Sequence, residues 1–273
     1  MSQVRDDLSG RLAPHLRDCR LCPRDCRTDR AAGGLGFCGA AIEGRCFASF
    51  VHFFEEARLV PSFVISFTGC NMRCAFCANH DAVRLPHLGS TIDPAFFRSE
   101  IERYARLGVT TVNLMGGEPA CNIFAIASIF DDFDCPLPVI WNSNLYFSPV
   151  LRDVVSNVAD IFLADLKFGN DQCAVRLASA PRYSQTVRDN ILALAPGADM
   201  IVRHLLMPGH FDCCTIPVFD WVAEHLPGVD VSLLGNFFPP RSTTCPELTR
   251  AITRDEYSRA AACARERGLH VIS

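Results

Sequence analysis

The chain has 273 residues, 49% of them hydrophobic, and a net charge of −4. This length and hydrophobic content suffice for one large domain with or without a small appendage. The charge excludes the basic footprint of a nucleic-acid-binding protein, and no apolar run reaches the roughly 18 residues of a membrane span. The first residues contain no secretory signal. We therefore expect a cytoplasmic protein without nucleic-acid or membrane partners, whose clustered cysteines bind metal or catalyse.

A Cys- and Arg-rich stretch of short, irregular runs occupies residues 1–58. We expect a small metal-binding module there, and a second domain over residues 59–273. Within the module, "CRLCPRDCRTDRAAGGLGFCGA" has a C-x2-C-x3-C-x11-C spacing. The candidate metal ligands are Cys19, Cys22, Cys26 and Cys38. Four thiolates serve either zinc or an iron–sulfur cluster, and unligated thiols are the less favoured alternative.

From about Val60 the pattern changes to apolar strands that alternate with helices. The expected strands cover residues 62–68, 110–115, 138–143, 160–166, 200–206, 229–234 and 269–273. Such near-continuous apolar runs are typical of parallel strands that are covered on both faces. Asp93 predicts the start of one helix and Gly108 its end, while Thr253 and Glu256 form the capping box of the last helix. These repeated units predict an α/β fold, either a doubly wound sheet or a barrel.

A cysteine loop, "SFTGCNMRCAFCANH" (66–80), follows the first of these strands. It lies at the carboxyl end of the strand, where α/β folds place their active sites. Cys70, Cys74 and Cys77 can bind three irons of a [4Fe–4S] cluster and leave the fourth iron open. Zinc would need a fourth ligand such as His80, and three ordinary buried cysteines are the remaining alternative.

Polar residues also end two later strands. Gly116 and Gly117 allow the backbone to approach a ligand closely, and the Glu118 carboxylate can accept from an ammonium group. Asp165 and Lys167 lie two residues apart and therefore face the same side of their strand. Of the 26 basic residues, Lys167 is the only lysine, which favours a function over a surface charge pair.

The cysteine loop, with the aromatic Phe76 before its last cysteine, resembles the C-x3-C-x-Φ-C signature of the radical SAM superfamily. The resemblance implies a partial (β/α)6 TIM-type barrel with S-adenosylmethionine (SAM) bound at a [4Fe–4S] cluster. It also implies reductive cleavage of SAM to a 5′-deoxyadenosyl radical that abstracts hydrogen from a substrate, with electrons from a donor such as flavodoxin or ferredoxin.

The same resemblance implies roles around SAM. It places Gly116, Gly117 and Glu118 at the SAM amino group, and Lys167 at the SAM carboxylate. Asp165 corresponds to a residue near a monovalent cation in glycyl-radical activating enzymes. The implied cofactor-binding residues are Phe76, Gly116, Gly117, Glu118, Asn142, Ser143, Asp165, Lys167 and Arg203. The implied catalytic residues are Cys70, Cys74, Cys77 and Lys167.

Over about residues 15–273 the chain resembles a radical SAM family named as pyruvate formate-lyase activating enzyme-like Fe–S proteins. This implies an activating enzyme or a related enzyme whose substrate is a protein, a peptide or a small molecule. A tailoring enzyme for a small molecule or peptide is one alternative. A non-enzymatic iron–sulfur or zinc protein for electron transfer or assembly is the other. The "VHFFEEA" stretch resembles a family linker, which implies that Glu55 and Glu56 lie at the pocket mouth unless both are simply exposed.

The remaining cysteines are scattered, and we interpret them as small buried hydrophobic residues. They are Cys46, Cys121, Cys135, Cys173, Cys213, Cys214, Cys245 and Cys263. A substrate-facing role for Cys213 or Cys214 is the less favoured alternative. We interpret His204 and His210 as structural polar residues.

Overall fold

The computed structural model describes residues 7–54, 56–240 and 243–272. By its packing the chain divides into two compact units, which are described separately. Unit 1 comprises Met1–Asn71 and Asn79–Phe162, and unit 2 comprises Met72–Ala78 and Leu163–Ser273. The described residues of the expected N-terminal module pack within unit 1, so a separate domain over residues 1–58 stays a prediction.

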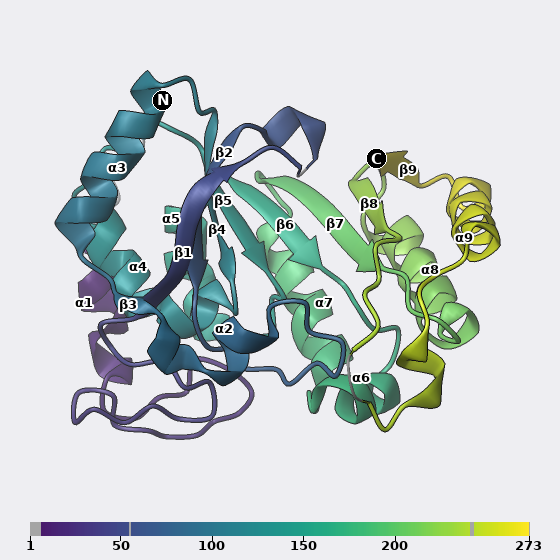
Figure 1. Cartoon of the computed structure of the whole chain (residues 1–273), viewed down its shortest axis with the longest axis horizontal. Helices are drawn as coiled ribbons and strands as arrows, with labels where there is room; N and C mark the ends of the chain where they lie inside the picture. Colours follow the sequence, from purple (N-terminus) through teal and green to yellow (C-terminus); the bar gives the residue numbers. More distant parts are fainter. Residues whose placement is uncertain (1–6, 55, 241–242, 273) are drawn as a thin grey trace. The chain divides into compact units, whose positions relative to one another are not determined.

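Unit 1 contains a mixed sheet with helices beside it (Figure 1). Its strands, in the order β3-β1-β2-β4-β5, are β3 (Ser90–Thr91), β1 (Arg45–His52), β2 (Ser62–Phe67), β4 (Thr111–Gly116) and β5 (Val139–Ser143). Its helices are α1 (Leu8–Leu12), α2 (His80–Arg84), α3 (Pro94–Arg106), α4 (Ile123–Phe130) and α5 (Arg152–Val158). Its short 3-10 helices are η1 (Ala13–His15), η2 (Ala57–Leu59), η3 (Pro86–Leu88), η4 (Pro119–Asn122) and η5 (Pro149–Leu151). The strands β2, β4 and β5 are parallel, whereas β1 pairs antiparallel with β2 and β3.

The parallel strands give unit 1 two chemically different faces, because successive side chains of a strand point in opposite directions. Phe63 and Val112 pair in register, and the Phe63 ring stacks on Tyr104 of α3 with centroids 4.6 Å apart. The helix α3 therefore covers the apolar face. The register places five buried polar residues on the opposite face, Ser62, Ser66, Thr111, Asn113 and Asn142.

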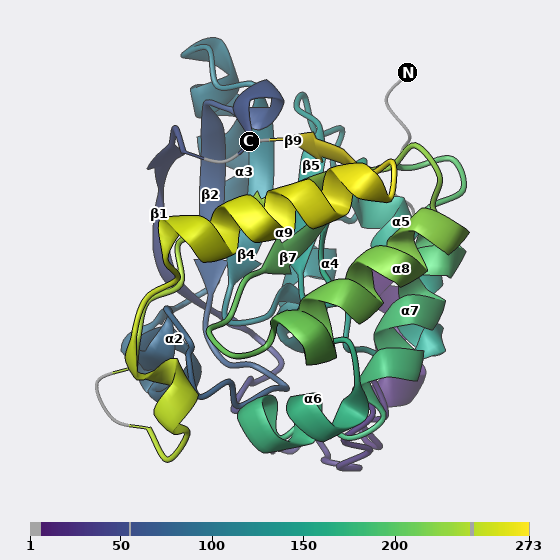
Figure 2. The same ribbon diagram turned by 90° about the vertical axis from the view of Figure 1, so that its right-hand side faces the viewer.

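Unit 2 is built from parallel strands and longer helices. The strand β6 (Ile161–Asp165) enters it from unit 1, and it is followed by β7 (Asp199–Leu205), β8 (Asp230–Leu234) and β9 (His270–Ile272). The neighbouring pairs β7–β8 and β8–β9 are parallel. Its helices are α6 (Asp171–Ala178), α7 (Tyr183–Leu194), α8 (Ile216–His225), α9 (Arg254–Glu266), the π-helix η6 (Phe211–Thr215) and the 3-10 helix η7 (Pro246–Thr249). Figure 2 shows α8 and α9 in front of β7.

The sequence-based prediction of the fold class is confirmed: the structure is α/β, its strands are mostly parallel, and their order is open, as in a partial TIM-type barrel. The caps of two helices are also confirmed, since Asp93 accepts from the N-terminal amides of α3, and Thr253 and Glu256 form the capping box of α9. Among the described residues, no helix is long and apolar enough to cross a membrane.

Two strands were not expected from the sequence. The strand β1 lies in the stretch that we expected to be loops, and β3 has only two residues. Both Phe47 and Phe50 of β1 are exposed, so this strand lacks the continuous buried pattern on which the prediction rested.

Candidate functional site

The cysteine loop begins directly after β2, and its first cysteine belongs to unit 1. Cys70 is buried, and its Sγ atom lies 3.7 Å from the Nδ2 donor of Asn144, which follows β5. The same amide donates to Asn71 Oδ1 at 3.1 Å, and Asn71 in turn donates to the Tyr146 carbonyl. These bonds hold the start of the cysteine loop against the carboxyl end of β5.

The other two cysteines of the loop belong to unit 2, where backbone bonds anchor them to α6. The amide of Arg73 donates to Ala178 at 2.8 Å, and the amide of Ala75 donates to Leu177 at 2.8 Å. Cys74 and Cys77 lie in one turn, because the Cys77 amide donates to the Cys74 carbonyl at 3.2 Å. Main-chain bonds therefore fix the conformation of this part of the loop.

An aromatic group accompanies these thiols. Phe76 is 7% exposed, and its ring lies 6.1 Å from the ring of Phe168 and 5.9 Å from that of Phe237. Burial raises the pKa of the Cys74 thiol to about 12, although the nearby Lys167 ammonium acts in the opposite direction. A metal that binds Cys74 must therefore displace a proton.

Three charged side chains converge beside Cys74 in unit 2. The Lys167 ammonium donates to one oxygen of Asp165, and Arg203 Nε lies 3.3 Å from the other. Burial would raise the pKa of Asp165, but the charges of Lys167 and Arg203 hold it below its usual value. Burial alone would lower the pKa of Lys167, yet Asp165 raises it above the usual value. These effects keep all three groups charged in a largely buried setting.

The Glu118 carboxylate is held by donors of unit 1. It is 1% exposed and accepts from Ser143 Oγ at 2.6 Å, from the Asn144 amide at 2.9 Å and from the Ala120 amide at 3.1 Å. Glu118 therefore caps η4 and ties the end of β4 to the end of β5. Its contact with the SAM amino group stays a prediction, as does a contact of Ser143 with SAM.

The paired glycines before Glu118 are required by close backbone approach. Gly116 has a φ of 115°, and a Cβ atom there would lie 2.4 Å from the Phe67 amide nitrogen. A Cβ atom at Gly117 would lie only 1.9 Å from the carbonyl oxygen of Gly69, the residue that precedes Cys70. The glycines thus let the end of β4 pack against the start of the cysteine loop.

The polar face of the unit 1 sheet contains buried groups that the described protein does not satisfy. None of the described residues accepts from Asn142 Nδ2 or bonds to either side-chain polar atom of Asn113. Asn142 is 8% exposed and Asn113 is fully buried. Buried polar groups normally have partners, so these amides suit a polar ligand or bound water on this face. The prediction that Asn142 contacts the cofactor fits this observation, while the sequence analysis did not single out Asn113.

The N-terminal cysteines line a small cavity in unit 1 together with Arg30 and Cys121. Arg30 is 3% exposed, and its guanidinium donates to Cys38 Sγ at 3.2 Å and to the carbonyl oxygens of Cys121 and Ala40. A hydrogen bond from Cys121 and the charge of Arg30 lower the pKa of Cys38 to about 5, although burial opposes this. The interpretation of Cys121 as a small buried residue is confirmed, but the residue is not scattered, because the fold places it beside Cys38.

A second correction concerns unit 2. Cys173, Cys213 and Cys214 were interpreted as scattered, and His210 as a lone structural residue, but the fold brings all four together. The H-x2-C-C pattern from His210 to Cys214 was the available signal in the sequence. Of the linker carboxylates, Glu55 lies outside the described residues, and Glu56 is 6% exposed rather than a surface group.

Comparisons with known proteins identify the family of the chain. The family model of the radical SAM superfamily matches residues 64–222, which is more than half of the chain. The chain is 31% identical over 274 residues to the uncharacterized protein MJ0674 of Methanocaldococcus jannaschii, with 97% of this chain and 80% of that protein covered.

Solved structures of Streptococcus suis SuiB share the fold. SuiB bound to precursor peptide SuiA gives a TM-score of 0.54 at 11% identity, over 74% of this chain and 46% of SuiB. SuiB bound to S-adenosylmethionine gives a TM-score of 0.51 at 13% identity, over 74% of this chain and 47% of SuiB. The chain thus spans about half the length of SuiB, and at this identity the likeness concerns the fold alone.

Proposed function

The chain belongs to the radical SAM superfamily, and from this membership we propose how its residues perform the chemistry of such an enzyme. We propose that Cys70, Cys74 and Cys77 hold a [4Fe–4S] cluster and that SAM binds to its open iron. When bound, the cluster and SAM would supply the reductive cleavage of SAM and the radical chemistry that abstracts hydrogen from a substrate. An electron donor such as flavodoxin or ferredoxin would reduce the cluster.

The observation that carries this proposal is the group formed by Asp165, Lys167 and Arg203 next to Cys74. Two of these side chains are cations and one is an anion, and all are largely buried. Such a group favours an anionic ligand, because a charge-assisted hydrogen bond to a buried cation is stronger than a neutral one. The carboxylate of SAM is an anion of the required kind. In this arrangement Asp165 orients the two cations, and a monovalent cation at Asp165 would have to compete with them.

The remaining residues of the site position the loop and exclude water. Backbone bonds at Arg73 and Ala75 fix the part of the loop that carries Cys74 and Cys77. Phe76 of the loop packs against Phe168 and Phe237, and such an apolar layer strengthens electrostatic contacts beside it. Asn142 offers a buried donor to the cofactor or substrate.

The substrate is inferred only as a class. The polar face that carries Ser66, Asn113 and Asn142 supports a substrate with hydrogen-bonding groups, because a purely apolar one would leave the buried amides unsatisfied. A protein radical site, a peptide and a polar small molecule all meet this requirement. Activation of a glycyl-radical enzyme and tailoring of a peptide or small molecule are therefore both consistent with the proposal.

We propose an iron–sulfur cluster for the N-terminal cysteines rather than zinc. The ligands of a single ion would lie within 4.8 Å of one another, and among the described residues these thiols do not form such a group. A cluster needs more widely spaced ligands, and the buried Arg30 would offset part of its negative charge. Such a cluster could deliver electrons within the enzyme.

Metal and ligand analysis of the reconstituted protein tests this assignment. The wild-type protein should bind SAM, and replacement of Cys70, Cys74 and Cys77 by alanine should remove about four irons per chain together with SAM binding. A protein that held this cluster but did not bind SAM would favour the non-enzymatic electron-transfer or assembly protein instead.

A further inference from the structure

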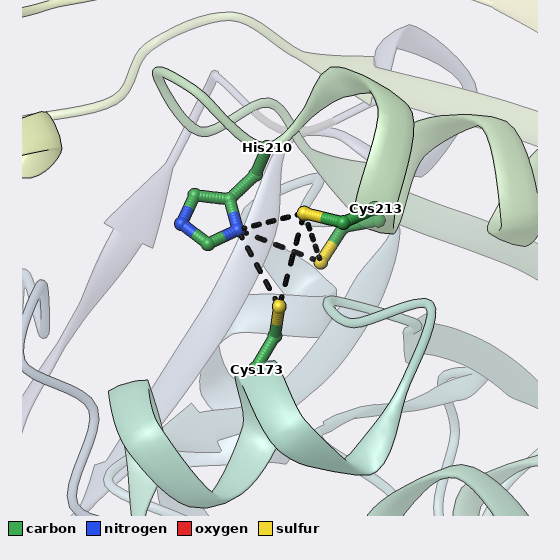
Figure 3. A group of neighbouring side chains, drawn as sticks. Cys173, His210 and Cys213 are labelled. Atoms are coloured by element: carbon green, nitrogen blue, oxygen red, sulfur yellow. Dashed lines mark hydrogen bonds between the residues drawn. The ribbon is translucent and has the colours of Figure 1, made fainter.

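Unit 2 contains a compact group of one imidazole and three thiols that the chemistry above does not use (Figure 3). Cys173 lies in the first turn of α6, and His210, Cys213 and Cys214 lie where the chain passes from β7 into η6. The Nδ1 atom of His210 faces the sulfurs at 3.7 Å from Cys173, 3.3 Å from Cys213 and 3.7 Å from Cys214. The side chains therefore point toward one common centre.

The spacing of these atoms matches a tetrahedral ion. Zinc binds sulfur at about 2.3 Å and nitrogen at about 2.0–2.1 Å, so the ligands lie about 3.8 Å apart for two sulfurs and about 3.6 Å for sulfur and nitrogen. The sulfurs of Cys173 and Cys213 are 3.8 Å apart, and those of Cys213 and Cys214 are 4.0 Å apart. All four ligand atoms lie within 4.8 Å of one another. The spacing of the four ligand atoms is thus close to that of a tetrahedral site.

The opposite side of the imidazole has the partners of a metal-bound histidine. His210 is 2% exposed, and its Nε2 atom lies 3.5 Å from a carboxylate oxygen of Glu247. Arg176 Nη1 donates to the same carboxylate at 2.5 Å. Arg176 Nη2 also lies 3.3 Å from His210 Nε2. A carboxylate beside the distal nitrogen is a common partner of a metal-bound imidazole, and an Nε2–H that donates to it would leave the Nδ1 lone pair for the metal.

We propose that Cys173, His210, Cys213 and Cys214 bind one zinc ion in a closed structural site. Four protein ligands leave no position for water or substrate, which is the property of structural rather than catalytic zinc. Three thiolates and one imidazole also select zinc over hard ions such as magnesium and calcium. A disulfide is the competing chemistry, but all three cysteines are free thiols in the structure.

The position of the site indicates what the ion would hold in place. Gly169 and Asn170 connect β6 to α6, and Asn170 Nδ2 donates to the Cys213 carbonyl at 2.7 Å. A Cβ atom at Gly169 would lie 2.8 Å from the carbonyl oxygens of both Cys213 and Cys214. The ion would therefore tie the segment after β6, which carries Lys167, to the segment after β7, which follows Arg203.

Metal analysis of the full-length protein, purified without oxygen, tests the proposal. A Cys173→Ser/Cys214→Ser variant should contain one zinc per chain fewer than wild type. Its matched control is Cys135→Ser/Cys263→Ser, which removes two buried cysteines elsewhere and should retain the wild-type zinc. Equal zinc in wild type and the first variant, or a loss of iron instead of zinc, would overturn the proposal.

X-ray absorption at the zinc edge of the wild-type protein provides a test that does not depend on the folding of a variant. The proposal predicts three sulfur ligands at about 2.3 Å and one nitrogen ligand at about 2.0–2.1 Å. A wild-type protein without zinc after incubation with the ion, a zinc site with oxygen ligands, or a disulfide between any two of the three cysteines in the anaerobic protein would contradict it.

Discussion

Lys167 and Asp165 form a largely buried ion pair at the end of β6, and Arg203 of β7 contacts the other oxygen of the same carboxylate. The pair joins two residues that point to the same side of the strand, so one carboxylate positions two cations. This geometry explains why the only lysine of the chain lies here. A compact ammonium reaches one carboxylate oxygen and leaves its other protons available to a ligand.

Replacement of Lys167 tests its role toward SAM. Lys167→Met removes a charge-assisted hydrogen bond worth about 1.5–3 kcal/mol, so the affinity for SAM should fall roughly ten- to a hundred-fold. Lys167→Arg should restore only part of it, because a planar guanidinium does not occupy the position of an ammonium. Arg259→Met, at an exposed position, is the control and should bind SAM normally. Equilibrium binding with the cluster intact measures the effect, and wild-type affinity in Lys167→Met would remove Lys167 from the site.

Glu118→Gln should destabilise unit 1. The carboxylate accepts from one hydroxyl and two backbone amides, and an amide side chain would turn a donor toward at least one of them. A buried donor left without an acceptor costs about 1–3 kcal/mol. Chemical denaturation should show a loss of this size, whereas Glu100→Gln on the surface of α3 should change the free energy of unfolding by less than about 0.5 kcal/mol. Equal stabilities of the two variants would contradict this account of Glu118.

His204 should make the protein sensitive to mild acid. Burial lowers the pKa of this imidazole to about 4, with a further contribution from Lys167, while its ordinary value is 6.5. In the unfolded chain this imidazole binds a proton below about pH 6.5, whereas in the folded chain it binds one only below about pH 4. The free energy of unfolding therefore falls as the pH drops through this window. Between about pH 7 and pH 5 the loss should be roughly 2 kcal/mol.

The His204→Asn variant isolates this contribution. The difference in the free energy of unfolding between wild type and variant should shrink as the pH falls from about 7 to about 5. The half-exposed His225 provides the control, and His225→Asn should show the pH dependence of the wild type. A difference that stays constant over this range would assign the acid sensitivity to other groups.

Iron and zinc analysis can identify the metal at the N-terminal cysteines. A Cys70→Ala/Cys74→Ala/Cys77→Ala variant should retain about four irons per chain if Cys19, Cys22, Cys26 and Cys38 hold a cluster. If these cysteines hold zinc, the variant should instead contain one zinc more than a variant that also lacks Cys19 and Cys22. If the site contains neither iron nor zinc, the prediction of a metal-binding module is refuted.

The sequence predicted the regular parts of the fold, since apolar runs and helix caps are local signals. The strand β2 is buried along its whole length. Thr253 and Glu256, only three residues apart, form the capping box of α9. The strand β1 was missed because its exposed Phe47 and Phe50 break the apolar pattern. Local spacing was sufficient to identify Cys70, Cys74 and Cys77 as candidates.

The missed parts of the site depend on contacts between distant residues. Cys173 lies 37 residues before His210, and only the fold places both beside Cys213. Cys121 meets Cys38 and Arg30 for the same reason. Asn113 lies within an otherwise apolar strand, and its importance follows from the absence of a partner among the described residues, which no sequence pattern encodes.

Anaerobic cleavage of SAM tests the central claim most directly. The reconstituted wild-type protein, given a reductant and SAM, should form 5′-deoxyadenosine and methionine in equal amounts. Cys74→Ala should abolish the formation of 5′-deoxyadenosine, because one of the three cluster ligands is lost. The control Cys263→Ala, which removes a buried cysteine elsewhere in unit 2, should still form it. Formation of 5′-deoxyadenosine by Cys74→Ala at the wild-type rate would contradict the account.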